Sequence, residues 1–256
     1  MSESPYVSPF RNYRGRCRPR EGEFAFQVVN EQTDLWIVAD GDLSEQVQQV
    51  VHTLRAQLKA CITLNPAFRH SLTPVPVNSD AAPLLRDMAE AARRCGVGPM
   101  AAVAGALAEH VCRAVVAHSP NLLVENGGDL FLHSARARVV GLLADPAAGA
   151  TLGLQLEAAD FPLSLCASSA SIGHSLSLGQ GDLVVVRARS GSFADAAATA
   201  LCNRLHDAQS IEHVLDCAKE LARPVRDAWP GHRLDGVLAQ CQGRLGVWGK
   251  MELVML

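Results

Sequence analysis

The chain lacks the features that mark secreted, membrane-spanning or cluster-binding proteins. It does not open on a basic stretch followed by an apolar run, and we find no window with the ~20 apolar residues of a membrane span. The eight cysteines are never closer than fifteen positions, which excludes the spacings of zinc and iron–sulfur sites. We therefore expect reduced, mostly buried thiols and a cytoplasmic protein that does not enter the membrane.

No sign of charge dominates, and aromatic residues are few. Lys and Arg number 23 against 26 Asp and Glu, so a general nucleic-acid-binding surface is not expected. The exception is residues 1–20, a basic arm with three prolines and no apolar periodicity. A solvated tail is the simpler interpretation of this arm, and phosphate or partner binding is the alternative. Its arginines are Arg11, Arg14, Arg16, Arg18 and Arg20.

The whole chain is 48% hydrophobic, and residues 21–256 alternate between strand-like and helix-like patterns, which predicts one α+β domain. Asp42 and Glu45 resemble a capping box at the start of a helix that continues to residue 61. Residues 66–79 hold three prolines and predict a surface connector. Strands are expected at 23–30, 33–39, 138–143, 151–157, 182–187, 234–239, 243–247 and 252–256, and further helices at 81–95, 99–117 and 211–221.

The most distinctive stretch is 122–132, where two apolar runs enclose Asn126, Gly127, Gly128 and Asp129. Asn-Gly is the strongest short signal for a hairpin turn, and that is the simpler interpretation. Glycines without a Cβ also let the backbone lie against a ligand, with an amide and a carboxylate on either side. Both interpretations remain open at this point.

Residues 96–101 match the letters of a dinucleotide fingerprint, Gly-x-Gly-x-x-Ala. A helical pattern precedes these glycines where the fingerprint requires a strand, so we reject a Rossmann site. A break between helices fits better, with Gly98 at the cap and Pro99 at the first helical position. The amide groups that begin this helix are candidates for binding a phosphate.

Residues 163–181 contain six serines and predict a polar loop that either satisfies its own backbone or surrounds a ligand. Within it, residues 173–177 nearly spell the serine-hydrolase elbow. The fifth position is serine instead of glycine, and two glycines follow where a helix is required, so a hydrolase is disfavoured. Cys166 enters this stretch and is the cysteine of most interest.

Asp195 and Thr199 stand four positions apart in an Ala-rich helix predicted to open at residue 193, and so share one face. A carboxylate and a hydroxyl are suitable ligands for Mg²⁺ bound to phosphates. Capping of the helix by Asp195 is the simpler interpretation.

Five motifs in order resemble the UPF0280 family, relatives of the ApbE flavin transferases. The resemblance implies an ApbE-like, T-fold-related α+β fold with two repeated β-β-α-α-β-β-like halves, and a cleft that holds FAD in the ApbE enzymes. The motifs are Glu-Gln-Thr-Asp-Leu at 31–35, Val-Gly-Pro-Met-Ala-Ala-Val-Ala-Gly at 97–105, Val-Glu-Asn-Gly-Gly-Asp at 124–129, Gly-His-Ser-Leu-Ser at 173–177 and Ala-Asp-Ala-Ala-Ala-Thr-Ala at 194–200.

The resemblance also implies roles for single residues. Asp195 and Thr199 would bind Mg²⁺, and His174 would occupy the place of the transferases' catalytic histidine, although their His-Ile-Ile-Asp-Pro setting is absent. The residues expected to line the FAD or FMN site are Gly98, Asn126, Gly127, Gly128, Asp129, Ser168, Ser169 and Ser175.

The implied activity is transfer of FMN to a hydroxyl of an acceptor protein by a cytoplasmic flavin-binding protein. The alternative is a non-catalytic accessory protein, since the family is linked to sulfur assimilation into homocysteine. Residues 166–171 read Cys-Ala-Ser-Ser-Ala-Ser where the family typically has Cys-Thr-Ser-Ser-Gly-Thr, and Gly181 replaces a usual alanine. The missing threonine removes a hydrogen-bonding hydroxyl, and the missing glycine restricts the backbone conformations of this loop, so whether the chain is an enzyme stays open. Whether it forms a homo-oligomer also stays open.

Overall fold

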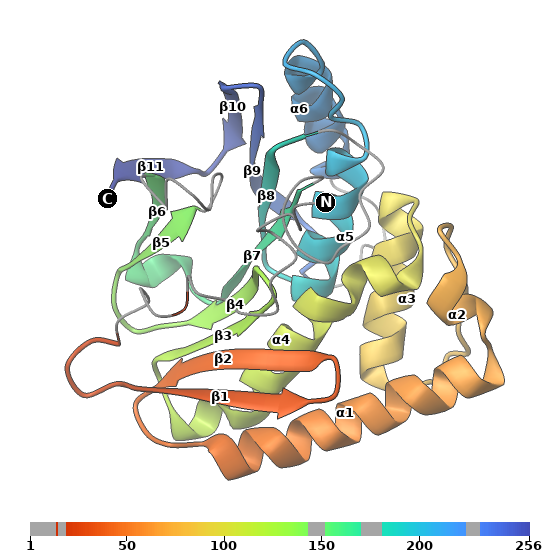
Figure 1. The fold of residues 1–256 in the computed structure, drawn as a ribbon, viewed down its shortest axis with the longest axis vertical. Helices are drawn as coiled ribbons and strands as arrows, with labels where there is room; N and C mark the ends of the chain where they lie inside the picture. Colours follow the sequence, from red (N-terminus) through yellow and green to blue (C-terminus); the bar gives the residue numbers. More distant parts are fainter. Residues whose placement is uncertain (1–13, 15–18, 143–151, 170–180, 224–230) are drawn as a thin grey trace, which may run out of the picture.

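The computed structural model describes residue 14 and residues 19–142, 152–169, 181–223 and 231–256, and within them the strands form two antiparallel sheets (Figure 1). The larger sheet has the order β1-β2-β3-β4-β7-β8-β9-β10, and the smaller sheet has the order β11-β6-β5. The strands are β1 (Phe24–Asn30), β2 (Thr33–Ala39), β3 (Leu122–Asn126), β4 (Asp129–His133), β5 (Arg138–Leu142), β6 (Leu152–Leu156), β7 (Leu163–Ser168), β8 (Leu183–Ala188), β9 (Leu234–Cys241), β10 (Arg244–Gly249) and β11 (Glu252–Met255).

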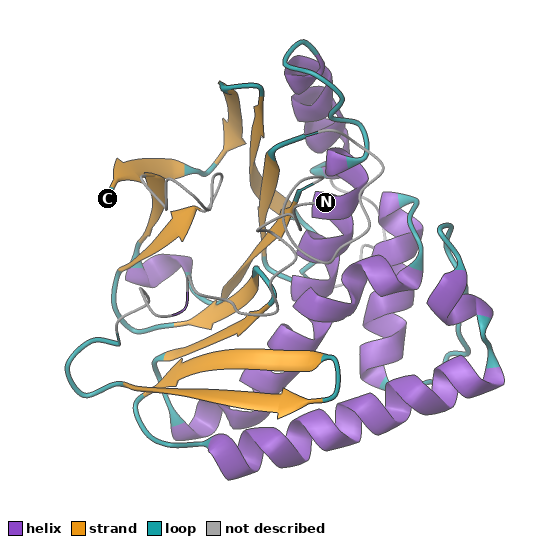
Figure 2. Ribbon diagram, viewed as in Figure 1, coloured by secondary structure: helices purple, strands orange, loops and turns teal. Residues whose placement is uncertain are grey.

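The α-helices cover one face of the larger sheet, and the smaller sheet packs on the other face (Figure 2). Strand β8 shows why both faces are apolar: Val184 and Val186 join the core beneath the helices, while Leu183 and Val185 join the core between the sheets. The helices are α1 (Ser44–Leu64), α2 (Ala67–His70), α3 (Pro83–Cys95), α4 (Val103–Val115), α5 (Gly191–Cys202) and α6 (Ser210–Leu221), with 3₁₀ turns η3 (Pro99–Ala102), η4 (Val116–His118) and η5 (Ala158–Asp160).

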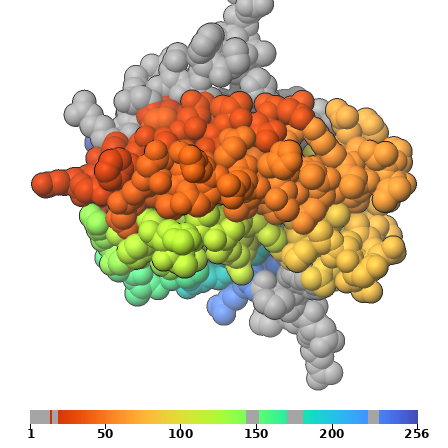
Figure 3. Space-filling view, turned by 90° about the horizontal axis from the view of Figure 1, so that it is seen from below, coloured from red at the N-terminus to blue at the C-terminus, as the bar shows by residue number. Residues whose placement is uncertain are grey.

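Helix α1 runs along the outside of the molecule beside β1 and β2. Figure 3 shows these three elements as a continuous red-to-orange band across one face. The buried stripe of α1 includes Val47, Val51, Leu54 and Leu58, which recur at helical spacing and pack into the core. Helices α4 and α5 lie deeper, against β3, β4 and β7, and therefore frame the centre of the sheet.

The predicted α+β class is confirmed, and most predicted elements lie within a few residues of the observed ones. The capping box is wrong, because Leu43 is the N-cap residue of α1 and no side chain caps the helix; Asp42 accepts from the Ser44 amide at 2.9 Å instead. The connector 66–79 contains the short helix α2. The loop predicted at 163–181 is also wrong in its first part, since β7 occupies Leu163–Ser168. The division into two repeated halves stays a prediction.

One helical stretch in the described part of the chain, Pro99–His118, is long and apolar enough by composition to cross a membrane, so the expectation that no such window exists was too strict. A core helix passes the same composition test. Here the stretch includes α4, whose Ala106, Leu107, Ala108 and Val111 belong to the core beneath the sheet. Its apolarity is therefore accounted for by packing inside the protein.

The predicted burial of the cysteines is confirmed for most of those that the structure describes. Five of the seven described cysteines are buried: Cys95, Cys112, Cys166, Cys202 and Cys241. Arg14 departs from the expected solvated arm, because only 6% of its surface is exposed.

Candidate functional site

The paired glycines form the turn of a tight hairpin between β3 and β4. Asn126 pairs with Asp129, and both Gly127 (φ 71°) and Gly128 (φ 106°) have the positive φ that such two-residue turns require. The hairpin interpretation is therefore confirmed. A Cβ added at Gly128 would meet no atom within 4 Å, so there is open space beside this part of the turn.

The hairpin also presents two buried polar side chains on the helix side of the sheet. Paired residues of an antiparallel ladder share a face, and the Asn126 Nδ2 donates to the Ala104 carbonyl at 3.2 Å, just where α4 begins. Asp129 is 4% exposed, and its Oδ1 accepts from the Ala167 amide on β7 at 3.2 Å. Residues 126–129 thus form a hairpin turn and also place two buried polar side chains on one face of the sheet.

Asp195 is not the cap of its own helix, contrary to the simpler interpretation of the sequence. Helix α5 begins at Gly191, and its cap is Ser190, whose side chain accepts from the Phe193 amide at 3.4 Å. Asp195 lies one turn further and accepts from the Gly105 amide at 2.9 Å, with the Ala104 amide as a second donor. The carboxylate therefore sits at the N-terminus of α4, where the helix dipole favours negative charge.

Asp195 thus occupies the Ala104 and Gly105 amides of α4. The amides expected to bind a phosphate are those that follow Pro99, in η3, and their role stays a prediction. Gly98 precedes η3 as predicted, with Pro99 at the first helical position. An added Cβ at Gly98 would lie 1.9 Å from the Ser71 carbonyl oxygen. The absence of a side chain at Gly98 is thus explained by packing against the connector.

Helices α4 and α5 cross at two glycines. A Cβ on Gly105 would lie 2.2 Å from the Gly191 carbonyl oxygen and 2.8 Å from the Cβ of Asp195. Glu109, one turn beyond Gly105, accepts from the Gly191 amide at 2.6 Å and from the Ser190 hydroxyl at 3.2 Å. Close approach at this crossing is what brings Asp195 within reach of the α4 amides.

Strand β7 lies beside Asp129 and packs against α5, the helix that carries Asp195. Ser164, Cys166 and Ser168 alternate onto the helix side of the strand. The Cys166 thiol lies 3.3 Å from the Ser164 hydroxyl and donates to the Gly191 carbonyl at 3.7 Å. The Ser168 hydroxyl is buried, and no described residue forms a hydrogen bond with it. A buried, unsatisfied hydroxyl is costly, and one at a strand end on this face is suited to a ligand.

The two carboxyl groups are held in an environment that opposes their ionisation. Burial raises the pKa of Asp195 from 3.8 to about 7, although the Gly105 and Ala104 amides act in the opposite direction. Burial also raises the pKa of Asp129 well above its ordinary value, and the charge of Asp195 raises it further. Burial likewise raises the pKa of the Cys166 thiol. A cation or a donor placed between these groups would offset the cost of ionising both carboxyls.

The structure thus brings together Asn126, Asp129, Ser168 and Asp195 around the start of α4 and the Cys166 thiol. Thr199 follows Asp195 by one turn of α5 and is half-buried, and Ser169 is buried at the end of β7. His174 and Ser175 lie outside the described residues. In the region that is described, no three His, Cys, Asp or Glu side chains are grouped to hold a metal ion. A cation here would have to complete its ligands with hydroxyl, carbonyl or phosphate oxygens.

Sequence reasoning did not assign a role to Gly105, Gly191 or Glu109, although they set the geometry of the crossing. The available signal was a glycine within an otherwise apolar helix, which usually has a packing reason. Its partner Gly191 follows Ser190 and lies before the predicted helix start, so nothing in the local pattern linked the two.

A family model, relatives in sequence and a solved structure all relate this chain to ApbE-like proteins. The family model described as "AbpE bacteria" matches residues 16–243. A UPF0280 protein of Methanocaldococcus jannaschii is 34% identical over 231 residues, covering 89% of this chain and 91% of the relative. A UPF0280 protein of Methanopyrus kandleri is 40% identical over 183 residues, covering 70% and 73%. The crystal structure of the ApbE protein from Thermotoga maritima shares the fold, with a TM-score of 0.53, 11% identity and coverage of 88% and 96%.

Proposed function

The chain belongs to the UPF0280 family of ApbE-like proteins, and from this premise we propose that it binds a flavin nucleotide beside the β3–β4 turn. The observation that carries the proposal is the convergence of Asn126, Asp129 and Asp195 on the start of α4. We place this activity in the cytoplasm, with FAD or FMN as the nucleotide and Mg²⁺ as the accompanying cation.

The residues present fit a Mg²⁺ ion. Asp195 offers a carboxylate, Thr199 a hydroxyl one turn later, and Asp129 a second carboxylate, all of them the oxygen ligands that Mg²⁺ prefers. The bound ion would neutralise the negative charge of a diphosphate. Burial raises the pKa of Asp195 to about 7, and a bound cation would lower the cost of ionising this carboxyl.

The protein's own groups would position the nucleotide. Gly127 and Gly128 lack side chains, so the turn can lie against the ligand. The Ser168 hydroxyl, which no described residue binds, can donate to a phosphate oxygen. Asp195 is held in one orientation by the Gly105 and Ala104 amides. Groups fixed before the ligand arrives lose little entropy on binding.

With FAD as donor, the chemistry is transfer of FMN to an acceptor protein. The hydroxyl oxygen of the acceptor attacks the phosphorus of the FMN half, the bond within the diphosphate breaks, and AMP leaves. The hydroxyl proton passes to a base, for which we propose His174. Ser175, next to it, and Ser169 are proposed to line the same site, as is Gly98.

The proposal is tested first by native mass spectrometry of the purified protein with FAD and Mg²⁺. We expect a complex with one nucleotide, and no such complex at micromolar ligand would contradict the proposal. Asp195→Asn should lose the complex, whereas Asp80→Asn, at an exposed position, should retain it.

The departure Cys-Ala-Ser-Ser-Ala-Ser at 166–171 favours a second candidate, an accessory protein that binds the nucleotide without turning it over. Incubation with FAD and Mg²⁺, followed by measurement of released AMP and of flavin fluorescence on denatured protein, separates the two. Release of AMP that disappears in the Asp195→Asn variant would exclude the accessory role.

A further inference from the structure

Arg14, from the arm that sequence analysis expected to be solvated, is buried between two carboxylates. Its Nε donates to the Glu125 Oε2 at 2.7 Å, its Nη1 to the Asp34 Oδ1 at 2.7 Å, and its Nη2 to the Asp34 carbonyl at 2.9 Å. Each of its three nitrogens therefore has an acceptor. Such a geometry uses the fixed fork of a guanidinium, which a lysine cannot reproduce.

Glu125 connects this ion pair to the turn of the candidate site. Its Oε2 binds Arg14, while its Oε1 accepts from the Gly128 amide at 2.9 Å. Glu125 precedes Asn126 on β3, so the two side chains point to opposite faces of the sheet. Arg14 is thus linked to the turn through Glu125, on the face of the sheet opposite to the one that carries Asn126 and Asp129.

The turn needs such a support, because both of its central residues are glycines with positive φ. Glycine loses more conformational freedom on ordering than any other residue, so two in succession leave the turn poorly determined by its own backbone. Arg14 also compensates two acidic side chains, Asp34 and Glu125, that share one face of the sheet. Without Arg14, the Glu125 carboxylate would lose a buried ion-pair partner and would be repelled by the charge of Asp34.

We propose that Arg14 is a positioning residue: it fixes the Glu125 carboxylate, which holds the Gly128 amide and so keeps the Asn126–Asp129 turn in its ligand-binding conformation. The effect on nucleotide affinity rests on the proposed function. The effect on the turn itself does not, and it is measured without a ligand.

The test compares Arg14→Met with the conservative Arg14→Lys in the full-length protein. Amide hydrogen exchange at Gly128, followed by NMR without ligand, should be at least about ten-fold faster in Arg14→Met, with Arg14→Lys between it and the unchanged protein. Isothermal titration with FAD and Mg²⁺ should show a Kd about ten-fold weaker in Arg14→Met, equivalent to about 1.4 kcal/mol.

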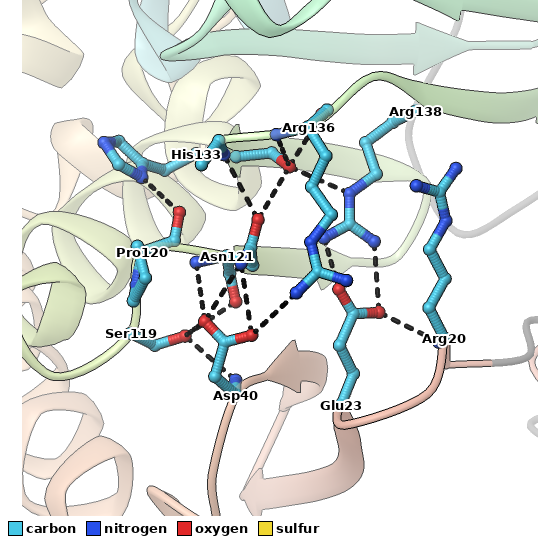
Figure 4. Close-up of polar contacts among 11 residues, drawn as sticks. Arg20, Glu23, Asp40, Ser119, Pro120, Asn121, His133, Arg136 and Arg138 are labelled. Carbon is cyan, nitrogen blue, oxygen red and sulfur yellow. Dashed lines mark hydrogen bonds and ion pairs between the residues drawn. The ribbon is translucent and has the colours of Figure 1, made fainter.

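A matched control is available at the opposite end of the same hairpin. Arg138, on β5, is equally buried and pairs with Glu23, as Figure 4 shows. Its Nε donates to the Ser134 hydroxyl at 2.9 Å, and Ser134 in turn donates to the Asn121 side chain at 3.1 Å. Arg138→Met should lower the unfolding temperature as Arg14→Met does, but leave both Gly128 exchange and FAD affinity unchanged.

Glu125→Gln tests the same link if the arginine variants do not fold. It keeps a side-chain oxygen that can accept from the Gly128 amide, but it loses the charge that Arg14 binds. It should show a smaller increase in Gly128 exchange than Arg14→Met. Unchanged Gly128 exchange in Arg14→Met, or an equal increase in Arg138→Met, would overturn the inference. Absence of FAD binding to the unchanged protein would instead overturn the proposed function and leave the exchange experiment decisive for Arg14.

Discussion

The carboxyl groups of Asp129 and Asp195 come from β4 and α5, yet they lie close enough for the charge of Asp195 to add to burial in raising the pKa of Asp129. The amides that begin α4 hold one of them, and the Ala167 amide on β7 holds the other. Two buried carboxyls in such proximity stabilise neither each other nor the fold when both are charged. Binding of a cation, with or without a phosphate, would explain why two buried carboxyl groups lie so close together.

Stability should fall as pH rises through the range in which Asp195 ionises. Its pKa is 3.8 ordinarily and about 7 in the folded chain, so the folded state binds more protons between these values. The free energy of unfolding then decreases with pH by as much as about 1.4 kcal/mol per pH unit. Urea unfolding of the unchanged protein and Asp195→Asn between about pH 5 and pH 8 measures this. If the unfolding free energies of the unchanged protein and Asp195→Asn changed in parallel with pH, Asp195 would not be the group responsible. Asp80→Asn should give the pH profile of the unchanged protein.

Removing the Ser168 hydroxyl should separate stability from binding. Ser168→Ala removes a buried group that has no hydrogen-bond partner among the described residues, so we expect the ligand-free protein to be more stable by about 1 kcal/mol while FAD binds more weakly. Ser164→Ala is the matched control, because the Ser164 hydroxyl donates to the Leu130 carbonyl at 2.7 Å and its loss should destabilise the protein. Stability lost equally in both variants would mean that Ser168 serves the fold alone.

The crossing of α4 and α5 should not tolerate a methyl group. In Gly105→Ala the new Cβ would lie 2.2 Å from the Gly191 carbonyl oxygen, so the helices must separate, at a cost of about 1–3 kcal/mol. The Asp195 contact with the Gly105 amide should weaken with it, and FAD affinity should fall. Gly41→Ala, where an added Cβ meets no atom within 4 Å, is the control for denaturant unfolding and titration. If Gly105→Ala and Gly41→Ala were equally stable, helices α4 and α5 would have room for a methyl group at Gly105.

The elements could be predicted from periodicity because each buries one stripe or face, as α1 does with Val47, Val51 and Leu54. Strand β7 was missed because its serines were taken as a loop signal. Leu163, Leu165 and Ala167 nevertheless alternate with Ser164, Cys166 and Ser168, and this period of two is the strand pattern.

The site was predictable only in part. Spacing placed Asp195 and Thr199 on one helical face, and the glycine pair indicated the turn. That Asp195 binds the start of α4 instead of capping α5 depends on the contact of Gly105 with Gly191, which are 86 positions apart in the chain. The burial of Arg14 depends likewise on Asp34 and Glu125, which meet only after β2 and β3 pair. Tertiary packing decides both, and no local pattern encodes it.

Titration of FAD with and without Mg²⁺ would decide whether the β3–β4 turn and the start of α5 together form one nucleotide site. We expect the unchanged protein to bind FAD at micromolar concentration only when Mg²⁺ is present, and both Asp129→Asn and Asp195→Asn to lose at least about ten-fold in affinity. FAD binding that does not depend on Mg²⁺, or that either variant leaves intact, would show that these elements do not form such a site.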